Sequence, residues 1–137
     1  MPLITSNAGE LELLDKLLKD PLTTNEDYVL KLFQNDYTPD QTTVEASLTE
    51  ANFTNYAAVT LTRSGWSDAV TVSNKAESSY ATQSWTCGTT GNSVYGYYVT
   101  GSTSGTVLWA ERFAATRTLV SSDVLNLQPK FTLNSEN

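Results

Sequence analysis

The feature that most constrains the fold is a short-range alternation of apolar and polar residues that recurs through residues 27–134. A period of two is typical of strands with one buried face. The clearest case is a predicted hairpin of residues 94–100 and 106–113, joined by a loop bounded by Gly101 and Gly105. The other expected strands are 28–33, 57–62, 66–73, 75–82, 84–87 and 124–133. Short strands with regular turns predict a mainly β fold, an antiparallel β-sandwich or barrel of the jelly-roll type.

The N-terminal part of the chain has a different pattern. Residues 1–6 are predicted to be an extended arm, and residues 7–20 an α-helix. Asn7 with Glu10 forms a capping-box pattern, leucines then recur at helical spacing, and Asp20-Pro21 ends the helix. We therefore expect one domain over residues 1–137, made of an arm, one helix and a β part over 27–134.

The last expected strand contains a proline. The apolar face of 124–133 is shared by Leu125, Leu127, Phe131 and Leu133. Pro129 interrupts this pattern, and a proline cannot donate a backbone hydrogen bond to a ladder. The strand is therefore predicted to lie at a sheet edge or to be bulged at Pro129.

The residue types argue against catalysis. The chain has no histidine and one cysteine, Cys87, so histidine-activated nucleophiles and zinc clusters are excluded within it. Cys87 is expected to be a small buried or half-buried filler rather than a nucleophile. We expect no catalytic residue, cofactor or metal, and no enzyme activity. A glycosidase built on two converging carboxylates stays open in principle, with scattered candidates at Glu50, Asp68, Glu77, Glu111 and Asp123.

The net charge of −7 and the pI of about 4.3 describe an acidic protein. Such a surface repels phosphate backbones and anionic lipid. Nucleic acid and membranes are therefore not expected partners.

Aromatic side chains are the strongest remaining signal. By alternation, Tyr95 and Tyr97 share one face of their strand and Tyr98 lies on the other. Core packing, a subunit interface and a sugar-stacking platform all remain open for these side chains and for the tryptophans. The candidate interface comprises Pro2, Leu3, Ile4, Tyr95, Tyr97, Tyr98 and Pro129.

Two charges lie in the otherwise apolar strand 107–113. Glu111 and Arg112 are expected to be paired, because charges in apolar strands seldom stay unpaired. Arg63 and Arg117 are the candidate partners. This pairing is interpreted as structural rather than catalytic.

Several stretches form a pattern that resembles a known family. They are Asn7-Ala8-Gly9-Glu10, 28–35, 48–56, 94–99, 108–113 and 125–131. In this order, over nearly the whole chain, they resemble small structural proteins of tailed phages, notably cyanophages.

The resemblance implies a virion protein made in the cytoplasm of a bacterial host. Its favoured role is a head decoration (cement) protein on the outer capsid surface, which braces the major capsid protein and forms a homo-oligomer. A trimer is favoured over a dimer. The alternatives are a tail or connector component, or a glycan-binding β-sandwich module.

Overall fold

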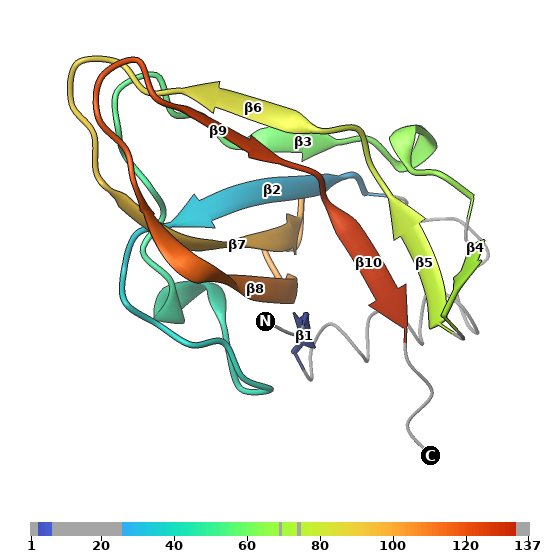
Figure 1. Ribbon diagram of the computed structural model, residues 1–137. Coiled ribbons are helices and arrows are strands. Elements are labelled where there is room, and N and C mark those ends of the chain that lie inside the picture. The colour runs from blue at the N-terminus through green and yellow to red at the C-terminus, as the bar shows by residue number, and fades with distance from the viewer. Residues whose placement is uncertain (1–2, 7–25, 69, 74, 134–137) are drawn as a thin grey trace.

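A computed structural model describes residues 3–6, 26–68, 70–73 and 75–133 (Figure 1). The protein is mainly β, and its strands pair in antiparallel fashion. This confirms the class predicted from the alternation. The expected helix over 7–20 and Pro2 lie outside the described residues.

Most of the expected strands are present, with changed ends. The strands are β1 (Ile4–Thr5), β2 (Tyr28–Phe33), β3 (Val59–Leu61), β4 (Val70–Val72), β5 (Lys75–Ser79), β6 (Gln83–Thr86), β7 (Ser93–Gly101), β8 (Val107–Thr118), β9 (Val124–Leu127) and β10 (Lys130–Leu133). Two short 3-10 turns are η1 (Glu45–Ser47) and η2 (Arg63–Gly65).

The described strands form three sheets. The largest has the order β1-β8-β7-β2-β3, the second β10-β5-β4, and the third pairs β6 with β9. Figure 1 shows β6 and β9 lying across one face of the large sheet, with β5 and β10 continuing from them. The chain thus places a second layer of strands over the β2–β7–β8 part of the first.

The main core lies between these layers. It contains Leu30, Leu32 and Trp109 of the large sheet together with Trp85 of β6 and Leu125 of β9. Burial of such apolar area is the main favourable term in folding. The core is therefore what holds the second layer against the large sheet.

Pro129 divides the last predicted strand in two. Its side chain is buried, and its carbonyl oxygen accepts a hydrogen bond from the Tyr80 N–H at 2.9 Å. β9 before it pairs with β6, and β10 after it pairs with β5. Among the described strands both β9 and β10 lie at sheet edges, as the missing proline N–H predicts.

Candidate interaction surfaces

The three tyrosines of β7 do not lie as simple alternation predicts. Tyr97 lies in the main core, whereas Tyr98 belongs to a second apolar cluster on the opposite face, and Tyr95 packs against that second cluster. The prediction that Tyr95 and Tyr97 share a face is therefore wrong. The reason is a register shift between Val94 and Gly96, where the partner strand β8 carries extra residues.

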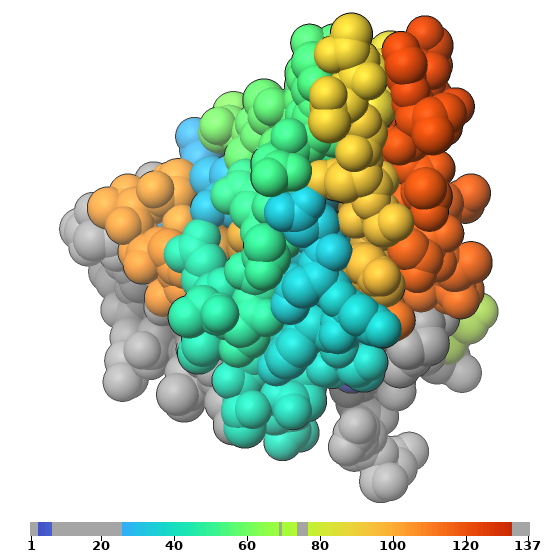
Figure 2. Space-filling view, turned by 90° about the vertical axis from the view of Figure 1, so that its left-hand side faces the viewer, coloured from blue at the N-terminus to red at the C-terminus, as the bar shows by residue number. Residues whose placement is uncertain are grey.

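The second aromatic face is covered by the chain itself. Residues 34–50, here called the covering segment, run between β2 and the turn before β3. Leu48 and Tyr37 of this segment pack against the cluster that contains Tyr98 and Phe33. Figure 2 shows the segment in cyan to teal on the surface of that side. Tyr98 is therefore buried by packing within the chain.

Ion pairs fasten the covering segment to the sheet. The Lys31 Nζ of β2 lies 2.6 Å from the Glu45 Oε1 and 3.6 Å from the Glu50 Oε2. Burial alone would lower the pKa of Lys31, but the two carboxylates raise it above its ordinary value. Lys31 therefore stays charged and acts as a clamp.

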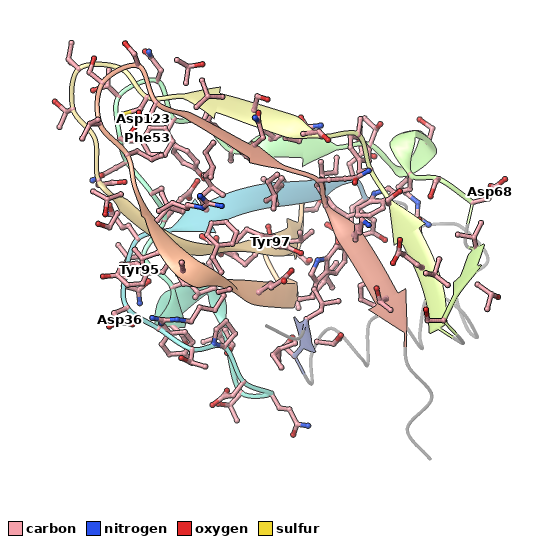
Figure 3. All side chains as sticks on the ribbon, in the orientation of Figure 1. Asp36, Phe53, Asp68, Tyr95, Tyr97 and Asp123 are labelled. Carbon is pink, nitrogen blue, oxygen red and sulfur yellow. The ribbon has the colours of Figure 1, made fainter. Side chains whose placement is uncertain are left out.

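A second clamp joins β8 to the start of the segment. The Arg112 Nη2 lies 2.6 Å from the Asp36 Oδ1, and its Nη1 donates to the Tyr37 carbonyl oxygen at 2.9 Å. The guanidinium also lies 5.2 Å from the centre of the Tyr95 ring. Asp36 and Tyr95 are labelled on this side of the molecule in Figure 3.

The Glu111 carboxylate lies on the other face and accepts a hydrogen bond from the Tyr97 hydroxyl at 2.8 Å. Glu111 and Arg112 thus each have a structural partner, as expected. The prediction that Arg63 or Arg117 is that partner is wrong. Alternation across the strand puts the two charges on opposite faces, where each meets a different neighbour.

Burial and nearby carboxylates raise the pKa of three tyrosines. Burial is the largest cause for Tyr56, Tyr97 and Tyr98, and Glu50 or Glu111 adds to it. In the folded chain each phenol keeps its proton above the ordinary pKa of 10.0. The Tyr56 and Tyr97 hydroxyls therefore stay protonated and donate hydrogen bonds to Glu50 and Glu111.

We expect the protein to lose stability in alkali. A pKa raised by folding contributes stability that is complete below the unfolded pKa and falls as pH rises above it. Phenolate absorbance during an alkaline titration should rise together with unfolding followed by circular dichroism. In Tyr97→Phe the unfolding midpoint should move to higher pH. Gradual ionisation of these three tyrosines in a chain that stays folded would contradict this expectation.

The other residues of the predicted interface lie apart from one another. Leu3 packs against the main core, and Ile4 pairs with Ala110 on the outer edge of the chain's own β8. Pro129 is buried between β9 and β10. The described members of the predicted interface are therefore distributed over both faces of the sheet and do not form one surface.

The tryptophans are used mainly in packing. Trp85 and Trp109 are buried, and the Trp85 Nε1 donates to the Ala57 carbonyl oxygen at 2.8 Å. Trp66 is half-buried and packs edge-on against Trp109 and Tyr80. No row of exposed tryptophan rings is therefore present in the described part of the chain.

The acidic candidates also have separate positions. The Glu50 carboxylate accepts a hydrogen bond from the Tyr56 hydroxyl, and the Asp123 carboxylate accepts one from the Val120 N–H. The Glu77 Oε1 lies 3.5 Å from the Lys130 Nζ. Asp68 and Asp123 lie at opposite ends of the molecule (Figure 3). Among the described residues no three metal-binding side chains cluster, and Cys87 is buried as expected.

A polar groove was not predicted from the sequence. It has a volume of about 560 Å³ and lies between the C-terminal end of β8 and β9. Its lining consists of Thr116, Arg117, Thr118, Leu119, Asp123, Val124, Leu125 and Asn126. No sequence pattern marks it, because its walls belong to strands that are consecutive in the chain but not paired with each other.

Comparison with known proteins does not assign the chain to a family. No protein-family model matches the sequence, and no curated protein matches it. No helix in the described part of the chain is long and apolar enough to cross a membrane.

Proposed function

We propose that this chain is a structural virion protein that decorates a phage capsid and stabilises it by binding the major capsid protein. In this proposal its two strand layers form an antiparallel sandwich of the jelly-roll type, and the protein acts on the outer capsid surface as a homo-oligomer. The proposal comes from the sequence resemblance over nearly the whole chain. A tail or connector component is the alternative assembly.

The observation that carries the proposal is how the chain uses its reactive side chains. In the described residues, Lys31 and Arg112 hold the covering segment on the sheet. The Tyr56 and Tyr97 hydroxyls bond to carboxylates, and two of the three tryptophans fill the core. The parts of the described chain that remain available to a partner are strand edges and exposed surface. This favours a protein that binds other proteins over an enzyme.

The glycan-binding alternative has less support. A sugar platform needs exposed aromatic rings that lie side by side. Trp85 and Trp109 are buried, and Trp66 presents only part of its ring. A platform would have to be built without the chain's tryptophans.

The test is the copy number of the chain in purified virions. Quantitative mass spectrometry should give a number of the same order as that of the major capsid protein. Particles assembled without the chain should lose DNA at lower temperature than complete particles. A handful of copies per particle would favour a tail or connector component, and absence from particles would refute the virion role.

A further inference from the structure

The groove between β8 and β9 has unpaired backbone on the β8 side. In an antiparallel ladder the backbone groups of successive residues point alternately to the two edges of a strand. The Leu119 N–H donates to the Asn92 carbonyl oxygen at 2.9 Å, on the β7 side. By alternation the N–H group of Thr118, which pairs with Ser93, points away from β7, toward the groove that Thr118 lines.

The opposite wall has the same character. The Asp123 carbonyl oxygen accepts from the Cys87 N–H at 2.8 Å, on the β6 side. Alternation then turns the backbone groups of Val124 and Asn126 away from β6, and both residues line the groove. Each wall thus offers strand hydrogen-bonding groups that no described strand uses.

The directions of the two walls are compatible with one added strand. β8 and β9 are consecutive and run in opposite directions, and residues 119–123 connect them at one end of the groove (Figure 1). A strand between them would be antiparallel to one wall and parallel to the other. It would join the large sheet to the β6–β9 pair.

The same edge of β8 already accepts a strand elsewhere. Ile4 and Thr5 of β1 pair with Ala110 and Trp109, farther back along β8. This contact shows that the outer edge of β8 binds an extended segment at residues 109–110, which are separated from the groove by the irregular stretch between Arg112 and Arg117. Beyond Ala110 no described strand continues on this edge.

The side chains indicate what such a segment carries. Arg117 is exposed and has no ion pair or side-chain hydrogen bond with the described part of the chain, although the protein as a whole is acidic. Val120 and Val124 beside the groove are 60% and 54% exposed. The site therefore combines strand hydrogen bonding with small apolar contacts and an arginine that pairs with no described residue.

We propose that the β8–β9 groove binds one extended segment of a partner protein, which adds as a β-strand and presents an acidic side chain to Arg117. Backbone hydrogen bonds supply the affinity of such a contact, and side-chain contacts supply its specificity. The inference concerns the mode of binding and does not require the partner to be a capsid protein.

A library of displayed random dodecapeptides, selected on the full chain, tests the proposal. We expect enriched peptides with β-branched residues around one aspartate or glutamate. Their synthetic, fluorescent forms should bind in anisotropy titrations, and Arg117→Glu should weaken binding about ten-fold or more, because it replaces an attractive charge pair with a repulsive one. N-methylation of alternate peptide amides should abolish binding, because it removes the N–H groups that would bond to the strand edges. This experiment changes the peptide and leaves the protein unchanged.

Arg63→Glu is the matched control, since it makes the same change of charge at an exposed arginine on η2. It should leave peptide affinity unchanged. Three outcomes would overturn the proposal: no enriched peptide, equal loss of affinity in both arginine variants, or full binding by N-methylated peptides. Self-association of the chain that Arg117→Glu disrupts and no peptide displaces would identify a second copy as the occupant and would also overturn it. Virion copy number is measured separately, so either idea can fail alone.

Discussion

Alanine in place of Gly96 is expected to destabilise the protein by about 3 kcal/mol, because overpacking against fixed backbone is not relieved by side-chain movement. A Cβ at Gly96 would lie 2.2 Å from the Glu111 carbonyl oxygen and 2.6 Å from the Phe33 Cε1. Gly96 pairs with Arg112 on one side and with Phe33 on the other. Neither neighbouring strand can retreat without breaking its own pairing with β7.

Gly105→Ala is the control for this prediction. Gly105 has a φ of +65°, so alanine there is strained, but the nearest atom to an added Cβ is the Glu45 Oε2 at 3.4 Å. We expect a cost of about 1 kcal/mol from backbone strain alone. Both free energies of unfolding can be measured by urea denaturation. Equal costs would show that the close approach at Gly96 is not what makes glycine necessary.

Replacing Trp109 with alanine is expected to destabilise the protein by about 4 kcal/mol, the usual range for a large aromatic removed from a core. Trp109 is buried. The distances from its ring centroid to the ring centroids of Phe131, Trp66 and Tyr28 are 4.8, 5.8 and 6.2 Å. These neighbours come from β10, from the end of η2 and from β2. One ring therefore joins three parts of the fold, and its loss leaves a cavity between them.

Trp109→Phe keeps most of the volume and should cost only about 1 kcal/mol. Hydrogen exchange followed by mass spectrometry should show faster exchange in β10 and β1 of Trp109→Ala, at positions that remain protected in Trp109→Phe. A loss of stability as large in Trp109→Phe as in Trp109→Ala would contradict the packing explanation.

The fold class could be predicted because it depends on local pattern. In residues 28–33, Leu30 and Leu32 are buried with the half-buried Lys31 between them, and the structure places β2 over the same residues. The hairpin with its glycine-bounded loop is present as β7 and β8, each longer than predicted. Pro129 interrupts the hydrogen bonding of whichever strand contains it, because proline has no backbone N–H. This property belongs to the residue and can be read from the sequence.

The surfaces could not be predicted in the same way. The face of Tyr95 depends on extra residues in β8, so alternation within β7 gave the wrong result. The covering segment has no strong periodicity, and only the positions of Lys31 and Arg112 explain why it packs on the sheet. The resemblance to phage structural proteins suggested the proposed role but no contact residues.

By itself, the sequence determined that this chain is β-rich, where most of its strands lie, and that it offers no histidine side chain. Those properties follow from residue type and from the two-residue period of a strand, which neighbours in the chain define. Only the tertiary structure decided which side chains are used up in packing, and that β8 and β9 diverge to leave a groove with unpaired edges. Such features depend on register and on contacts between residues far apart in the chain, for which a local pattern carries no information.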